Sequence, residues 1–388
     1  MLTETINLSA SQYHQFDNRT LADKLQAQVK LKIDDVVDTR TMRAHVVETQ
    51  TENQTAMKVV KLEFQNRDQE LVSMPLTNWA HKQVAEKCGI PTRYYARMLS
   101  GEDHHELLVN NINEWLGDKD RRMVRTLDGK IRAILSDRYK CLDNYDLAML
   151  AYKRFVQHGA AFEDAHLSDT RMYIRAAIPH LSIDIDDYKN GINPEGYEGF
   201  YSKNSKKDIL TAGLILSNSE VGAGRFLVQP FIKRLVCSNG MIGMSTFSRV
   251  HLGSTHELGE VISDRTNALK DEALWSEVGD IIDAAFDGNR FLEWVGENVM
   301  EKKSVEIITP TEAIGNLTSH YKMDDSDKED IINQMMTGKD TSQWGLINAV
   351  TATANMGREI EEQLALQKIG GELTEMKVKD FNRIIKQE

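Results

Sequence analysis

Cationic side chains are concentrated in one short segment of the chain, between residues 119 and 140. Eight Lys or Arg residues there stand against three Asp residues, a local excess of five positive charges. Lysine and arginine neutralise phosphate groups, so a cluster of this kind is a typical footprint of a nucleic-acid contact. The cations that we expect to contact phosphate are Arg121, Arg122, Arg125, Lys130, Arg132 and Arg138.

The same segment has the sequence pattern of a β-hairpin. An Asp-Gly pair at residues 128–129 separates two alternating runs, and a type I′ turn favours this pair because both positions need positive φ. Side chains alternate along a strand, so Arg121 and Arg125 share one face of the first strand, and Lys130 and Arg132 share one face of the second. If the strand register pairs these faces, the hairpin becomes a basic ribbon that can follow a phosphate backbone.

Two other interpretations of these cations stay open. The first is that the hairpin face is only solvated and binds nothing. The second is that Arg132 and Arg138 are buried structural arginines that pair with Asp137 or Asp143. Substitutions would then lower stability before they lowered any binding.

Arginine and tyrosine also occur together in other strands and helices. Arg171, Tyr173 and Arg175 alternate and therefore share one face of an expected strand. Tyr95 lies in a second Arg-Tyr cluster, and Tyr139 follows the hairpin. Tyrosine offers a stacking surface for an unpaired base, so these three tyrosines are candidate base platforms. The alternative is that each tyrosine belongs to the core or its boundary.

Evidence for catalysis is weaker. Asp184, Asp186 and Glu220 are carboxylates of the kind that hold Mg²⁺ for phosphoryl chemistry, although a polar turn and a capping glutamate are the more common explanations. The three cysteines are far apart and form no zinc-binding pattern. We therefore expect no catalytic residue and no cofactor, with magnesium only if the protein is an enzyme.

The distribution of hydrophobic residues predicts an α+β protein. Short, valine-rich, alternating segments dominate up to about residue 255 and indicate a strand- and hairpin-rich body with packed helices. From residue 256 the period changes to about 3.6, which indicates a mostly helical module. We therefore expect a boundary near residue 255, with a body at 1–255 and a helical module at 256–388.

Charge divides at the same place. The whole chain of 388 residues carries 47 basic and 59 acidic side chains, a net charge of −12. Residues 256–388 hold 14 basic and 27 acidic residues, net −13, so residues 1–255 are close to neutral at +1. The acidic total therefore does not exclude nucleic acid, because phosphate binding depends on local patches.

Four ordered segments resemble a phage/plasmid-like protein family, a domain of unknown function of prophages and conjugative plasmids. They are the helix, Gly-Ile-Pro turn and tyrosine segment at 76–99, IRAILSDRYKCLDNYDL at 131–147, SNSEVGAGRFLVQPFIKRLVCSNGMIG at 217–243 and TSQWGLINAVTATAN at 341–355. The chain departs from the family where typical members follow Asn-Ala-Val-Thr with acidic residues and a histidine, because Ala-Thr-Ala-Asn-Met stands at 352–356.

This resemblance implies a mobile-element protein with a role in DNA maintenance. We expect a non-catalytic protein that binds single-stranded DNA and promotes annealing in recombination or replication, as phage annealing proteins do. Residues 256–388 would assemble a homo-oligomer or recruit a host or phage protein. The alternatives are a phage protein that binds or inhibits a host protein, and a metal-dependent enzyme acting on nucleic acid. The N-terminus has no signal-peptide pattern, and no segment is apolar enough for a membrane, so we expect a cytoplasmic protein of the bacterial host cell.

Overall fold

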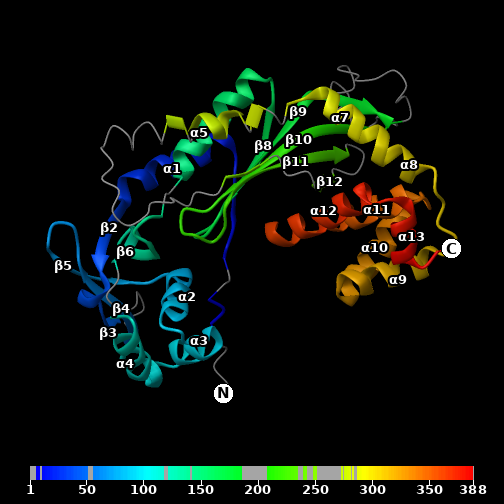
Figure 1. The fold of residues 1–388 in the computed structure, drawn as a ribbon. Coiled ribbons are helices and arrows are strands. Elements are labelled where there is room, and N and C mark those ends of the chain that lie inside the picture. Colours follow the sequence, from blue (N-terminus) through cyan, green and yellow to red (C-terminus); the bar gives the residue numbers. More distant parts are fainter. Residues whose placement is uncertain are drawn as a thin grey trace.

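The computed structural model shows a mixed α+β protein, as the sequence predicts (Figure 1). Antiparallel sheets with helices form the N-terminal part, and a helical region forms the C-terminal part. The structure describes residues 6–8, 11–50, 56–117, 121–139, 142–185, 208–234, 239–242, 248–250, 272–273, 275–280, 282–283 and 286–387.

A seven-stranded antiparallel sheet forms the middle of the molecule. Its strand order is β1-β8-β9-β10-β11-β12, and β13 also pairs with β11. The central strand β10 is buried along its whole length, because its two faces contribute to different hydrophobic clusters. The strands are β1 (His14–Phe16), β8 (Ala161–Leu167), β9 (Met172–Asp184), β10 (Ile209–Asn218), β11 (Phe226–Arg234), β12 (Asn239–Ile242) and β13 (Ser248–Val250).

Two helices cover one face of this sheet, α1 (Asn18–Leu31) and α5 (Asn144–Gln157). Leu21 and Leu25 of α1 and Phe155 of α5 pack into one cluster with side chains of β8 to β11. The side chain of Asp17 caps α1 by accepting hydrogen bonds from the first free backbone N–H groups of the helix. The helices thus bury their apolar stripes and leave their polar faces in water.

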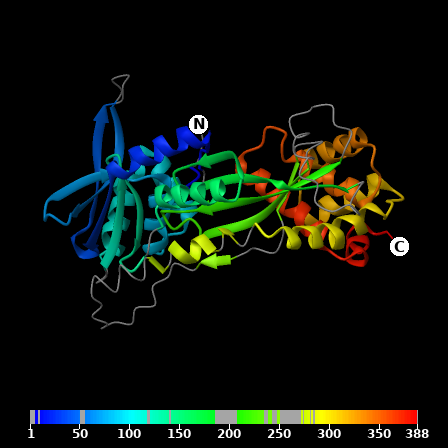
Figure 2. The ribbon, with the colours of Figure 1, turned by 90° about the horizontal axis from the view of Figure 1, so that it is seen from above.

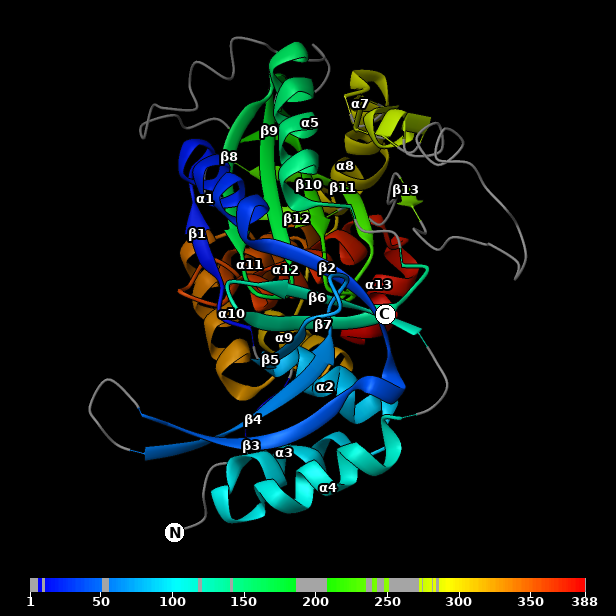
Figure 3. The same ribbon diagram turned by 90° about the vertical axis from the view of Figure 1, so that its left-hand side faces the viewer.

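The predicted hairpin is confirmed as β6 (Arg121–Leu127) and β7 (Lys130–Ser136). Its turn has φ of +50° at Asp128 and +70° at Gly129, the conformation that the Asp-Gly pair favours. Strand β2 (Lys32–Asp38) pairs with β6 to complete a three-stranded sheet, which Figure 3 shows from the hairpin side.

A second three-stranded sheet and a helical layer complete the N-terminal body. The sequence predicts a helix capped by Thr77, and the Thr77 side chain indeed accepts a hydrogen bond from the backbone N–H of Ala80. This helix and the two after it pack on the sheet, and Tyr95 lies in the shared core with Phe64. The elements are β3 (Arg43–Gln50), β4 (Ala56–Gln65), β5 (Leu71–Pro75), α2 (Asn78–Lys87), α3 (Thr92–Ser100) and α4 (His105–Trp115).

The C-terminal region is helical, as predicted. Helix α11 lies at its centre with every residue buried, which explains why its sequence shows no polar stripe. The helices are α7 (Gly288–Trp294), which continues through a π-helical turn at Val295–Val299 into α8 (Met300–Lys303), α9 (Pro310–Tyr321), α10 (Asp325–Gly338), α11 (Gln343–Thr353), α12 (Ile360–Glu375) and α13 (Val378–Ile385). Within the described residues, no helix has both the length and the apolar character that crossing a bilayer requires.

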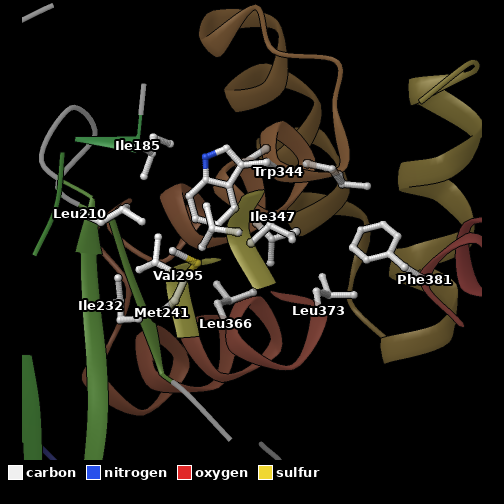
Figure 4. Close-up of a cluster of buried hydrophobic side chains, with 14 of the residues drawn as sticks. Ile185, Leu210, Ile232, Met241, Val295, Trp344, Ile347, Leu366, Leu373 and Phe381 are labelled. Atoms are coloured by element: carbon white, nitrogen blue, oxygen red, sulfur yellow. The ribbon is translucent and has the colours of Figure 1, made fainter. Parts of the chain in front are cut away.

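The molecule has the shape of an arch. The two three-stranded sheets with their helices lie at one end of the seven-stranded sheet and the C-terminal helices lie at the other, as Figures 1 and 2 both show. One hydrophobic cluster joins the sheet to the helices, because it contains Leu210 and Ile232 of the sheet together with Trp344, Leu366 and Phe381 of the helices (Figure 4). The change of sequence pattern near residue 255 therefore does not coincide with a break in the core.

Candidate functional site

The hairpin does not form the predicted basic ribbon. A bulge shifts the register, so that Arg125 lies opposite Ala133, Thr126 lies opposite Ile131, and Arg132 has no partner across the strand pair. The hairpin is also covered on both faces, because one face packs into the core of the second three-stranded sheet and the other packs against the loop around Val221.

The predicted contact residues of the hairpin region, which are phosphate ligands and one base platform, therefore divide into three groups by exposure. Arg125 and Arg132 are buried, with 2% and 8% of their surface exposed. Arg122 and Tyr139 are partly exposed, and the exposed cations are Arg121, Lys130 and Arg138. Only the three exposed cations can reach a DNA strand without first leaving the protein core, a step that would cost free energy.

A buried carboxylate, Glu220, explains why Arg132 lies inside. The Nη1 atom of Arg132 is 2.9 Å from Glu220 Oε2, and the Lys32 ammonium pairs with Glu220 Oε1. The backbone N–H of Asn144, at the start of α5, donates to the same Oε1 at 2.7 Å. Burial alone would raise the pKa of Glu220, but the charges of Arg132 and Lys32 outweigh it and hold the pKa below its usual value.

Arg125 joins three segments next to this carboxylate. Its Nε donates to Asp34 at 2.8 Å, its Nη2 donates to Asp143 at 3.1 Å, and its Nη1 donates to the backbone carbonyl of Glu220 at 2.8 Å. Asp143 is thus the partner of Arg125 rather than of Arg132, which pairs with Glu220 instead. Both arginines connect the hairpin to the β10–β11 loop and are structural.

The carboxylates considered as magnesium ligands are separated in space. Asp184 pairs in register with Ile209 at the start of β10, whereas Glu220 follows Asn218 at its end. At a rise of about 3.3 Å per residue, the length of β10 puts them roughly 30 Å apart, so they cannot bind one ion. Asp186 lies outside the described residues, among which there is also no group of three or more His, Cys, Asp or Glu side chains suited to a metal.

The other Arg-Tyr clusters are also occupied by internal contacts. Arg175 pairs with Asp164, its Nε donating to Oδ1 at 2.7 Å, and the guanidinium of Arg171 donates to the backbone carbonyl of Ala223. Tyr173 is 7% exposed, and its ring lies 5.8 Å from the ring of Tyr13. These arginines stabilise the sheet and its loop, and Tyr173 belongs to the core.

Tyr95 is fully buried and does not face solvent. Its hydroxyl lies 2.9 Å from Nδ1 of His81, which is also buried. Burial raises the pKa of Tyr95 and lowers the pKa of His81 to about 3, so both groups are neutral near pH 7. Tyr95 is therefore a core residue, which is the alternative that its sequence context left open.

A polar pocket of about 370 Å³ lies at the tip of the hairpin, and we call it the hairpin-tip pocket. Its walls come from the N-terminal segment, α1, the hairpin, the β8–β9 turn and the starts of α2 and α5. The lining residues are Gln12, His14, Phe16, Lys24, Gln28, Leu31, Thr77, Leu127, Asp128, Lys130, Arg132, Asn144, Leu167, Ser168 and Asp169.

The lining residues differ in burial, and we use that difference to name the floor, walls and mouth of the pocket. Arg132 and Asn144 are buried and form a polar floor. Phe16 and Leu167 are apolar and lie in its walls. Lys24 and Lys130 are exposed and stand at the mouth, as do two acidic residues, Asp128 and Asp169. The two lysines can meet an anionic group of a ligand and the apolar walls can meet a flat ring, whereas the two carboxylates keep the mouth close to neutral overall.

Sequence reasoning named Lys130 and Arg132 but missed the rest of this pocket. Lys24 and Gln28 lie near the N-terminus, in a segment for which the sequence predicted no site, and Asn144 lies more than a hundred residues later. No local motif links these positions, because only the packing of α1 and α5 on one sheet brings them together.

Comparisons of the chain with known protein families, with curated proteins and with solved structures find no match.

Proposed function

We propose that the chain is a non-catalytic, single-stranded-DNA-binding protein of a phage or plasmid, and that it holds DNA at the hairpin-tip pocket. The observation that carries this proposal is the pair of exposed lysines, Lys24 and Lys130, at the mouth of a polar pocket. Two ammonium groups beside a cavity can neutralise successive phosphates of a strand while its bases face the protein.

The remaining exposed cations extend this contact. Arg121 and Arg138 lie at the end of the hairpin away from Lys130, and β6 spans seven residues, or about 23 Å at a rise of about 3.3 Å per residue. A strand that reaches from the pocket to these arginines covers several nucleotides. The buried arginines Arg125 and Arg132 position the hairpin and do not contact phosphate in this proposal.

The acidic helical region has a separate role in this proposal. Its negative charge disfavours DNA, so DNA runs along the N-terminal body, and the helices are left to assemble subunits or to recruit a host or phage protein. A homo-oligomer would place several hairpin-tip pockets along one strand and thereby promote annealing.

The test is fluorescence anisotropy with a labelled oligothymidylate at salt concentrations between about 50 and 200 mM. The double variant Lys24→Glu/Lys130→Glu should bind at least about tenfold more weakly and lower the slope of log affinity against log salt by about 1.4, since each lost phosphate contact removes about 0.7. The double variant Lys153→Glu/Lys379→Glu makes the same charge change at exposed sites outside the pocket and should bind nearly normally.

Light scattering of the same samples measures the mass of the free protein and of the complex. A flat salt response, or the absence of any DNA complex, contradicts the proposal. Capture of one stable host protein without a DNA complex would favour the host-binding alternative instead.

A further inference from the structure

The floor of the hairpin-tip pocket presents hydrogen-bond donors. The side-chain amide of Asn218 donates to Oδ1 of Asn144 at 2.8 Å, which leaves the amide nitrogen of Asn144 as its remaining polar group. Glu220 fixes the guanidinium of Arg132 through Nη1, and arginine has further N–H groups but no acceptor. Both residues are buried and line the pocket, so the floor suits a group that accepts hydrogen bonds.

The walls above this floor are suited to a flat ring. Leu167 is buried, Phe16 and Leu127 are partly buried, and all three line the same cavity. Apolar side chains of this kind contact the faces of a nucleobase, while its edge carries carbonyl and ring-nitrogen acceptors. The volume of about 370 Å³ is at the scale of one small ligand rather than of a duplex.

We infer that the hairpin-tip pocket takes one unpaired nucleotide of the bound strand. The base inserts between the apolar walls with its acceptor edge on Arg132 and Asn144, and its phosphate stays at the mouth beside Lys24 and Lys130. This inference rests on the proposed function and adds the physical reason for single-strand specificity. A base inside a duplex is paired and stacked, and it must leave the stack at a cost before it can enter a pocket.

Glu220 is a positioning residue in this arrangement. It touches no DNA, but its carboxylate holds the Arg132 guanidinium nearby as an ion pair and also accepts a hydrogen bond from the backbone N–H of Asn144 at the start of α5. Both floor residues are therefore held by the same buried group.

The first arm of the test uses the wild-type protein, so it does not depend on the folding of a variant. An oligothymidylate and a fully abasic strand of equal length carry the same phosphates, but only the first carries bases. Base insertion predicts that the abasic strand binds at least about tenfold more weakly, with a similar salt slope. Equal affinity for the two strands overturns the inference and leaves the proposed function standing.

The second arm fills the pocket. Gln28 lines it from α1 and Gln26 lies on the exposed side of the same helix, so Gln28→Trp should weaken oligothymidylate binding about tenfold and Gln26→Trp should not. Circular dichroism melts of both variants test whether they are folded. Unchanged binding by a folded Gln28→Trp protein overturns the inference.

Calorimetry with thymidine monophosphate separates the two proposals. If the free nucleotide binds wild type and is lost in Gln28→Trp while no oligonucleotide binds, the pocket takes free nucleotides, and both strand insertion and the proposed function are overturned. If neither ligand binds, both proposals fail.

Discussion

Glu220 is the residue on which the hairpin region depends most. Replacement by glutamine should lower the free energy of unfolding at pH 7 by about 3 kcal/mol, because it leaves the buried charges of Arg132 and Lys32 without their anion. The folded-state pKa of Glu220 is lowered, so its stabilising effect is complete above the unfolded value of about 4.5 and is lost as the pH falls through the folded value. Urea unfolding at pH 7 and at successive pH values below about 4.5 measures both effects.

The difference between wild type and Glu220→Gln should therefore shrink in acid, where the native carboxylate also becomes protonated. Asp137→Asn is the matched control, because Asp137 is an exposed carboxylate at the end of the same hairpin, and it should change stability little. A stability loss in Glu220→Gln that stays constant down to the most acidic pH would contradict the ion-pair explanation.

Among the secondary-structure elements, the hairpin turn is the one that the sequence predicts most accurately. Gly129→Ala should destabilise the protein by about 1–2 kcal/mol, since its φ of +70° is strained for a residue with a Cβ even though the space around it is open. Thermal unfolding measures the loss. Gly117→Ala is the control, because that glycine also has open space and no positive φ, and equal losses in both variants would argue against backbone strain as the cause.

The sequence predicted those features of the elements that depend on residues close together in the chain. The turn at Asp128, the cap at Thr77 and the helical period after residue 256 each depend on a few neighbouring residues, and all three are confirmed. The environment of the hairpin arginines was not predictable, because it depends on a bulge in β7 and on Glu220, which is about ninety residues away. The hairpin-tip pocket was missed for the same reason, since its lining residues come from distant segments.

The whole molecule is held together across the point where its sequence pattern changes. Leu210, Ile232 and Met241 of the sheet lie in one cluster with Trp344 and Phe381 of the helices (Figure 4). A polar contact adds to it, since Asp283 accepts a hydrogen bond at 2.8 Å from His158, the residue that follows α5. Charge and hydrophobic period thus change at residue 255, but the packing that stabilises β9 to β12 comes from both sides of it.

A fragment of residues 1–255 should therefore fail to fold as an independent unit. Removal of the helices exposes the end of the sheet that carries Leu210, Ile232 and Met241, and each large apolar side chain returned to water costs about 1.5–3 kcal/mol. For the three side chains together the loss is about 4.5–9 kcal/mol, which is comparable to the whole stability of a typical domain, about 5–15 kcal/mol. We expect the fragment to aggregate or to bind a hydrophobic dye, and to show no cooperative melt by circular dichroism, whereas the full chain melts cooperatively. A monomeric fragment that melts cooperatively near the temperature of the full chain would show instead that residues 1–255 form a self-sufficient domain.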